Sequence, residues 1–239
     1  MSTDYYARLE QQRGPQPSTQ MLGSLARALR LSAEERDYLY RIAGQNAPTR
    51  LATSDYVAPA LLRVLDRLTD TPALILSALG ETLVQNDPAR ALFGDASRYQ
   101  GLERSAIHRW FVRPEERLRY PEEDRERQSR SQVASLRAAY GSLGAQSPAG
   151  EIVDDLTERS EEFRRLWATH EVGRRFEDHK VLVHPEIGPI ELDCQALFTE
   201  DQSQALLVLT APPRTDGWQK LQLLSVIGAQ RFEAASEPR

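Results

Sequence analysis

The sequence predicts an α+β protein, in which a small all-α N-terminal unit precedes an antiparallel sheet domain with a large helical insertion. Two patterns support this prediction. Apolar residues recur at helical spacing in the first 45 residues and again through the middle of the chain. Short apolar runs bounded by turn residues lie on both sides of that helical middle. Because 239 residues exceed one average domain, we expect two domains.

Three short helices are predicted for residues 1–46. The first begins at Thr3 behind a Ser2 cap and ends before Arg13, where glycine and prolines break it. The second covers about residues 19–29. The third begins at Ser32, which opens a capping box with Glu35. We expect the third helix to bury Leu39, Ile42 and Ala43.

A polar stretch over residues 45–54 reads as a linker, so the second domain is predicted for residues 55–212 and a C-terminal helix and tail for 213–239. An amphipathic helix over 57–68 opens this domain. Apolar runs at 73–79 and 81–86 around Gly80 predict a β-hairpin. A short helix follows, with Asp87 as its expected cap and Pro88 in its first turn.

Helical patterns then cover residues 102–112, 122–140, 149–156 and 160–170. Strands are predicted at 180–184, 189–199 and 205–210, with a turn at 185–188. A closing helix over 218–227 carries an apolar stripe of Leu221, Leu224 and Ile227. Two uses of this stripe remain open, packing back on the sheet, which we favour, and pairing with another chain.

Composition and charge favour a cytoplasmic protein without membrane insertion. No run of about 18 uncharged apolar residues occurs, the N-terminus lacks a secretion signal, and the single cysteine excludes an internal disulfide framework. The formal net charge is −5, yet the first 50 residues hold seven arginines against five acidic residues. This distribution suits a small DNA-reading head on an acidic body.

The first helix, Ser2-Thr3-Asp4-Tyr5-Tyr6-Ala7-Arg8-Leu9-Glu10, resembles the recognition helix of the XRE family of helix-turn-helix regulators. The resemblance implies that this helix enters the major groove of double-stranded operator DNA and that the protein is a homodimer reading two half-sites. The alternative is that its polar residues form the solvated face of an ordinary three-helix bundle. The candidate DNA-binding residues are Thr3, Asp4, Tyr5, Arg8 and Arg13.

This N-terminal part departs from the XRE pattern, because the two helices that precede the recognition helix in that family are missing. In the family a valine commonly precedes the serine, and a GTG valine codon read as a start would give Met1. We therefore expect a misplaced start, with roughly 35 to 40 residues missing, and operator binding once both helices are restored. The rival hypothesis is a true truncation that senses ligand without binding DNA.

Residues 55–212 resemble the MmyB/MltR-type ligand-binding domain, a PAS-like fold that accompanies this helix-turn-helix, mainly in actinomycetes. Four segments carry the resemblance: Asn86 to Asp95, Trp110 to Pro114, Ser160 to His170 and His184 to Asp193. It implies a sensor of a fatty-acid-like small molecule, which needs an apolar pocket and a few polar groups for the carboxylate. The candidate ligand-binding residues are Asn86, Trp110, Phe111, Arg113, Trp167, His170 and His184.

The candidate ligand-binding residues can also be interpreted as residues that only stabilise the fold. The aromatic residues at helical spacing are typical of an ordinary core. Asn86 before a helix is typical of a cap or turn. His184 beside Pro185 can order the hairpin, and Arg113 can pair with a surface acid.

We also considered an enzyme and a pure interaction module. The four histidines lack metal-ligand spacing, Cys194 is alone, and neither a phosphate loop nor a Gly-x-Ser-x-Gly motif occurs. The acidic pairs at 122–123, 154–155 and 161–162 fit solvated helix faces. We therefore expect no catalytic residue, no metal site and no cofactor. An interaction module remains the alternative function.

Overall fold

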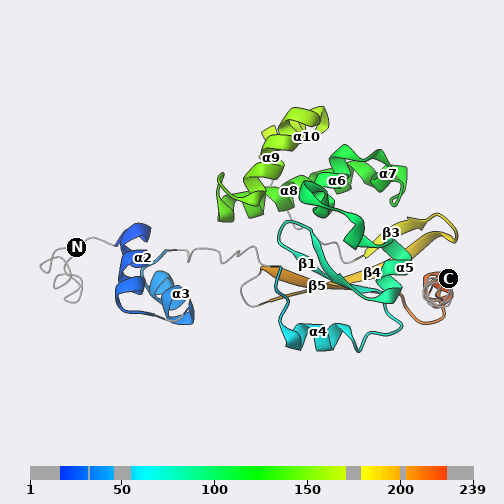
Figure 1. The fold of residues 1–239 in the computed structure, drawn as a ribbon, viewed down its shortest axis with the longest axis horizontal. Coiled ribbons are helices and arrows are strands. Elements are labelled where there is room, and N and C mark those ends of the chain that lie inside the picture. Colours follow the sequence, from blue (N-terminus) through cyan, green and yellow to red (C-terminus); the bar gives the residue numbers. More distant parts are fainter. Residues whose placement is uncertain (1–16, 32, 46–54, 171–178, 200–202, 225–239) are drawn as a thin grey trace, which may run out of the picture. The chain divides into compact units, whose positions relative to one another are not determined.

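The computed structural model describes residues 17–31, 33–45, 55–170, 179–199 and 203–224. The chain divides into two compact units, residues 1–49 and 50–239 (Figure 1). The expected first helix and the Ser32 cap lie outside the described residues. The five candidate DNA-binding residues lie outside them too: Thr3, Asp4, Tyr5, Arg8 and Arg13.

The described part of the N-terminal unit is a pair of helices, α2 (Thr19–Ala28) and α3 (Ala33–Ile42). The buried residues are Leu22, Leu25 and Ala26 of α2 and Tyr40 of α3. The Tyr40 hydroxyl donates to the carbonyl of Thr19 at 2.9 Å and ties the helices together. The prediction that Ile42 is buried is wrong, since it is 63% exposed. Because Ile42 lies two positions after Tyr40 on the same helix, its side chain points to the side away from α2.

The larger unit contains a five-stranded antiparallel sheet in the order β2-β1-β5-β4-β3. Its central pair, β1 and β5, joins the N-terminal hairpin to the C-terminal strands, with Ile75 opposite Leu206. The prediction of an α+β fold with an antiparallel sheet is confirmed. The strands are β1 (Ala73–Ser77), β2 (Thr82–Gln85), β3 (His179–His184), β4 (Gly188–Phe198) and β5 (Gln204–Thr210).

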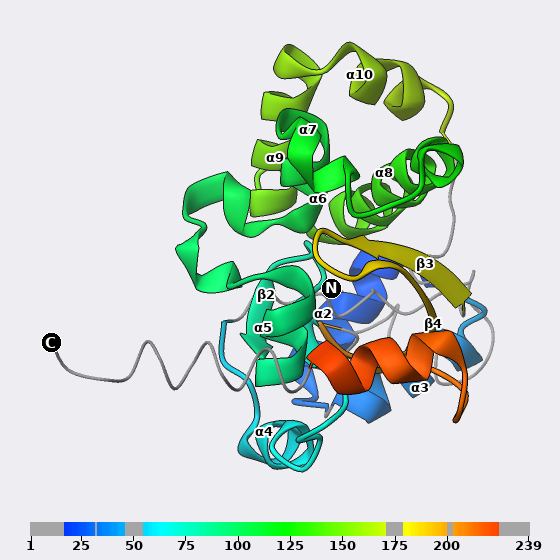
Figure 2. The same cartoon turned by 90° about the vertical axis from the view of Figure 1, so that its right-hand side faces the viewer.

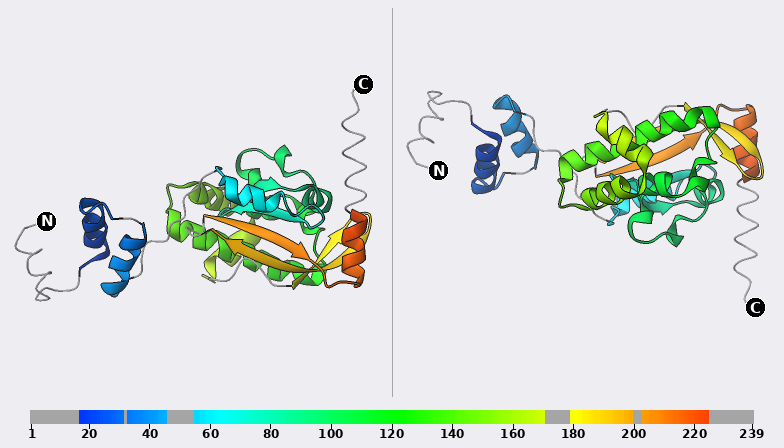
Figure 3. Two further views of the ribbon diagram at one scale, coloured as in Figure 1. Left: turned by 90° about the horizontal axis from the view of Figure 1, so that it is seen from below. Right: turned by 90° about the horizontal axis from the view of Figure 1, so that it is seen from above.

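One face of the sheet is covered by α4 (Pro59–Leu65). Leu65 of this helix packs on Ile75 of β1 and Leu206 of β5, which point to the same side of the sheet. Figure 2 shows α4 on one side of the sheet and helices of the insertion on the other, and the two views of Figure 3 look at the unit from below and from above. Because both faces of β1 are covered, all five of its residues are buried.

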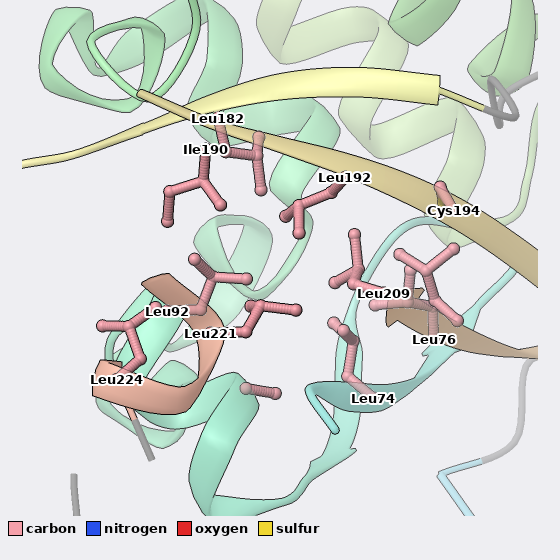
Figure 4. Packing of buried hydrophobic residues seen from close by; sticks show 12 residues of the cluster. Leu74, Leu76, Leu92, Leu182, Ile190, Leu192, Cys194, Leu209, Leu221 and Leu224 are labelled. Atoms are coloured by element: carbon pink, nitrogen blue, oxygen red, sulfur yellow. The ribbon is translucent and has the colours of Figure 1, made fainter. Parts of the chain in front are cut away.

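The opposite face of the sheet packs against α5 (Asp87–Phe93) and a helix over residues 216–224. In Figure 4, Leu92 of α5 and Leu221 and Leu224 of the second helix lie opposite the aliphatic side chains of β3 and β4. Leu221 and Leu224 of the predicted apolar stripe therefore pack on the sheet, while Ile227 lies outside the described residues. The described part of residues 213–239 thus belongs to the same core as the strands.

The helical insertion between β2 and β3 forms a core of its own, with Leu136, Leu156 and Phe163 at its centre. Its last helix begins at the Ser160 cap, whose hydroxyl accepts from the Phe163 amide at 3.1 Å. The longer helices are α6 (Ala106–Val112), α7 (Pro114–Arg117), α8 (Arg125–Leu143), α9 (Pro148–Arg159) and α10 (Glu161–Ala168). Two 3₁₀ turns precede α6, η1 (Ala96–Arg98) and η2 (Gly101–Arg104), and a third, η3 (Glu122–Asp124), lies between α7 and α8.

Candidate ligand-binding site

A pocket of about 590 Å³ lies where α5, the segment 115–119 and the β3–β4 turn meet. We call it the first pocket. Leu92, Leu118 and Val183 give it apolar walls, and Leu224 of the closing helix contributes to the same surface. The full lining is Arg90, Ala91, Leu92, Phe93, Gly94, Arg98, Glu115, Leu118, Arg119, Val183, His184, Pro185 and Leu224.

The first pocket carries more positive than negative charge. Three arginines, Arg90, Arg98 and Arg119, line it together with a single carboxylate, Glu115. Arg90 donates to Asp87 at 2.6 Å, and its side chain is 31% exposed. The side chain of Arg119 is 28% exposed and lies 3.6 Å from Glu116. An apolar cavity with guanidinium groups in its wall can hold an amphiphile that ends in an anion.

Asn86 positions α5, the helix that supplies one wall of the first pocket. It is the N-cap of α5, so the expectation that Asp87 caps this helix is wrong. Its side-chain oxygen accepts from the amides of Ala89 and Ala73, each at 3.0 Å. Its amide nitrogen donates to the carbonyls of Leu68 at 2.6 Å and Thr71 at 2.8 Å. With these four bonds the side chain joins α5 to β1, and it lines no pocket described here.

A second wall, the segment 115–119, is held by a buried ion pair. Nε of Arg109 donates to Oε1 of Glu116 at 3.2 Å, and the Tyr99 hydroxyl donates to the same oxygen at 2.8 Å. The Arg109 guanidinium lies 3.9 Å from the centre of the Tyr99 ring. Burial lowers the pKa of Arg109, and the charge of Glu116 opposes that effect. The amide of Val183 then donates to the Arg119 carbonyl at 2.8 Å, which fixes the segment on β3.

Arg113 points to acids at the surface. It donates to Glu103 at 2.7 Å and to Glu115 at 3.2 Å. These hydrogen bonds raise the pKa of Arg113, and the bond from Arg113 lowers the pKa of Glu103. Its side chain is 39% exposed and is not part of the first pocket wall, although Glu115 is.

His184 lies in the first pocket wall and is fixed by two backbone contacts. The Glu186 amide donates to Nδ1 at 3.2 Å, and Nε2 lies 3.3 Å from the Ala91 carbonyl. Nδ1 therefore accepts, while Nε2 carries the proton and donates, which describes a neutral ring. The imidazole links the β3–β4 turn to α5 and contributes surface, not charge, to the first pocket.

A smaller cavity of about 130 Å³, the second pocket, adjoins the first, because Phe93 and Arg119 line both. It lies between Leu74, Leu76 and Leu207 of the sheet and helices α6 and α8. Trp110 is part of this wall. Its indole nitrogen donates to the Ser129 hydroxyl at 2.9 Å, and its ring meets Tyr120 edge-on.

The other aromatic candidates lie in the core of the insertion. Phe111 contacts Phe163 edge-on, and Trp167 stacks on Phe163 at a centroid distance of 5.4 Å. Arg137 covers the Trp167 ring at 4.5 Å. His170 follows the end of α10, is exposed and has a φ of 55°. None of these three candidates lines either pocket. Of the seven ligand candidates, His184 lines the first pocket and Trp110 lines the second, so the structure brings no two of them into one pocket.

Arg90, Arg98, Arg119, Lys180 and Gln132 line the two pockets but were not among the sequence candidates. Arg90 stands inside the Asn86 to Asp95 segment that carries the family resemblance, so a signal for it existed. The others come from segments that only the fold brings together. Their residue types are too common on protein surfaces to be singled out by pattern.

Histidine and acidic residues also meet in the insertion. His108, 2% exposed, lies with Nε2 2.7 Å from Oδ2 of Asp155, so this acid is not simply part of a solvated helix face. The pair joins α6 to α9. Within the described ranges, the acids, histidines and cysteine form no group of three or more that could hold a metal ion. No helix among these residues has both the length and the apolar character needed to cross a bilayer.

Comparison with known proteins identifies one family. Residues 57–224 match the family model described as the MmyB-like transcription regulator ligand binding domain. The match begins beside α4 and ends in the helix over 216–224, so it includes both pockets. No curated protein matches the chain.

Proposed function

Because the chain belongs to the family of MmyB-like transcription regulator ligand-binding domains, we propose that it is a DNA-binding regulator that senses a fatty-acid-like molecule in the first pocket. The family gives the general role, ligand sensing in a transcription regulator. The chemistry of the first pocket supports the narrower proposal. We further propose a cytoplasmic homodimer that binds operator DNA.

The observation that supports a fatty-acid-like ligand is the combination of size, apolar walls and unequal charge in the first pocket. Its volume of about 590 Å³ lies within the range of small-molecule sites. The aliphatic walls can take an acyl chain, and Arg90, Arg98 and Arg119 can pair with a carboxylate. His184, which we propose as a wall residue, is neutral and adds no charge to that pairing.

Two measurements test whether the protein binds a fatty acid. Protein purified under native conditions is extracted and analysed for acyl lipids by mass spectrometry. Saturated acids of 10 to 16 carbons are then added to the delipidated protein, and its melting temperature is measured. An acid present at 100 times its Kd stabilises the folded state by about 2.7 kcal/mol. Empty extracts together with an unchanged melting temperature for every acid would reject the proposal.

Two variants with matched controls locate the ligand. Leu118→Glu places a carboxylate in the wall of the first pocket. Its control, Leu197→Glu, places a carboxylate on β4, outside both pockets. Both leucines are exposed, at 62% and 52%, so neither change should unfold the protein. Likewise Arg98→Gln removes a pocket cation, whereas Arg63→Gln removes an exposed cation from α4. Only Leu118→Glu and Arg98→Gln should weaken acid binding.

The DNA-binding part of the proposal depends on the N-terminal unit. We propose that Thr3, Asp4, Tyr5 and Arg8 face the major groove, with Arg13 as a further DNA contact. A selection of bound sequences from random double-stranded DNA, followed by titration, tests it on a protein in which both helices that precede the recognition helix in the XRE family are present. Arg8→Ala should weaken specific binding about tenfold or more. If no sequence is enriched, the alternative function, a ligand-binding or interaction module that does not bind DNA, is favoured.

A further inference from the structure

The second pocket differs from the first in its polar groups. It is a cavity of about 130 Å³ between the sheet and helices α6 and α8, close to the volume of a short polar end group with its neighbouring carbons. Most polar atoms around it are satisfied within the protein. Trp110 donates to Ser129, and Glu116 accepts from Arg109 and Tyr99.

Among the polar residues that helices α6 and α8 contribute to the second pocket, Gln132 of α8 is an exception. Gln132 lines the second pocket, and its side-chain oxygen is buried without a hydrogen-bond partner among the described residues. A buried polar atom without a partner costs roughly 1 to 3 kcal/mol, so such atoms commonly meet a ligand or water. This oxygen therefore marks a place where a hydrogen-bond donor is missing.

Lys180 of β3 is a charged group on the sheet side of the second pocket. It lies on the same face of its strand as Leu182 and His184, two and four positions further on, and so faces the inner side of the sheet. Its side chain lines the second pocket. Within the described part of the chain its ammonium group has no hydrogen-bond or ion-pair partner. An ammonium group donates only, so the half-buried Lys180 can bind an acceptor on a ligand.

We propose that the ligand carries a second polar group, a hydroxyl at the end of its acyl chain, and that this hydroxyl binds between Gln132 and Lys180 in the second pocket. A hydroxyl donates one hydrogen bond and accepts two, so it can donate to the Gln132 oxygen while accepting from Lys180. A methyl end leaves both groups unsatisfied. A carboxylate cannot donate to the amide oxygen.

The two pockets share Phe93 and Arg119 in their linings and so lie side by side, and the proposal places one molecule across both. The carboxylate then pairs with arginines in the first pocket, and the chain passes Phe93 to place its hydroxyl in the second. The ligand class is therefore a hydroxylated fatty acid. This inference rests on the proposed function, since it requires that an acyl ligand binds.

The test compares two series of ligands on the full-length chain by isothermal titration calorimetry. One series holds saturated acids of 10 to 16 carbons, and the other holds the same acids with a hydroxyl on the terminal carbon. For the chain length that fits, the hydroxy acid should bind about tenfold or more tightly than its plain partner, because sites built to hydrogen-bond a hydroxyl discriminate strongly against analogues without it.

Gln132→Met and Lys180→Met should each reduce this preference to about twofold or less, because either change removes one partner of the hydroxyl. Lys220→Met is the matched control. Lys220 pairs with Asp216 outside both pockets, and its variant should keep the full preference. Circular dichroism shows whether each variant is folded, and the two pocket variants on different elements test the site independently.

The outcomes separate the two proposals. If no acid of either series binds, the proposed function fails and the inference fails with it. If plain acids bind and a hydroxyl adds no affinity at any chain length, the inference is wrong and the proposed function stands. If the hydroxyl preference persists in both Gln132→Met and Lys180→Met, the hydroxyl binds elsewhere and the assigned site is wrong.

Discussion

Nε of Arg109 lies 3.2 Å from Oε1 of Glu116, and the two side chains are only 6% and 10% exposed. This pair connects α6 to α7 and fixes the wall of the first pocket at Glu115 to Arg119. Glu116→Gln keeps the shape of the side chain but leaves the buried Arg109 cation without its counter-charge. We expect the free energy of unfolding to fall by about 3 kcal/mol in urea denaturation. This loss is at the low end of the range for a buried ion pair, because Arg109 still donates to two carbonyls.

Glu115→Gln is the control for this change, since the neighbouring carboxylate is 61% exposed and pairs with Arg113 at the surface. It should leave the stability close to that of the wild type. Equal stability of Glu116→Gln and the wild type would show that the pair does not hold α7 in place.

Asn86 provides the second prediction. Asn86→Ala removes four hydrogen bonds that join α5, β1 and the segment before it, so we expect a loss of roughly 2 to 4 kcal/mol in the free energy of unfolding. Asn86→Ser restores an N-cap acceptor but not the amide donors, and it should recover part of this stability. Thermal or urea denaturation of the three proteins checks the order.

The same variants test whether Asn86 contacts the ligand, as its sequence context suggested. Because Asn86 lines neither pocket, the affinity of Asn86→Ser for a bound acid should stay within about twofold of the wild type. A variant with near-native stability and strongly reduced affinity would instead favour direct contact.

The third prediction concerns pH. The hydrogen bond from Arg113 lowers the pKa of Glu103 below its ordinary value of 4.5, so the folded state favours the carboxylate. A group with a lowered folded pKa contributes stability above its unfolded pKa, and this contribution is lost as the pH falls through the folded pKa. Arg113→Gln should therefore raise the pKa of Glu103 toward 4.5 and reduce the stability that the protein loses below about pH 4.5.

Carbon NMR of the Glu103 carboxyl measures this shift directly. Arg130→Gln is the control, because Arg130 pairs with Glu126 on the exposed face of α8. It should leave the Glu103 titration unchanged. An unchanged Glu103 pKa in Arg113→Gln would mean that another group lowers it.

Local sequence signals predicted much of the fold because helices, caps and turns depend on neighbouring residues. The hairpin around Gly80 is one example and is present, and the helix predicted over residues 160–170 is found at Glu161–Ala168. The strand order could not be predicted in this way. β1 pairs with β5, and the contact between Ile75 and Leu206 depends on packing of the whole unit and not on any local pattern.

The candidate site was less predictable, because residue type does not reveal which polar groups are satisfied within the fold. Asn86 and Arg113 resemble ligand contacts in sequence, yet both are engaged by protein partners. Trp110 and Phe111 are neighbours, but successive helical residues point about 100° apart. Trp110 therefore lines the second pocket, while Phe111 packs on Phe163 in the insertion core.

The last prediction concerns Phe93, which lines both pockets and so divides the space available to a ligand. Phe93→Ala removes the ring and should move the preferred acid to a longer chain, whereas Phe93→Trp should move it to a shorter one. Affinities across the 10- to 16-carbon series measure the shift. Phe93 also packs against the core, so Phe93→Ala should lower stability by about 2 kcal/mol, somewhat less than for a fully buried phenylalanine.

Tyr56→Ala is the control for loss of an aromatic ring, since Tyr56 is 70% exposed and lines neither pocket. It should leave chain-length preference unchanged. If Phe93→Ala and Phe93→Trp also leave the preference unchanged while the acids still bind, the ligand does not pass this ring. Binding would then be confined to the first pocket, and the hydroxyl preference should be absent as well, so the two experiments must agree.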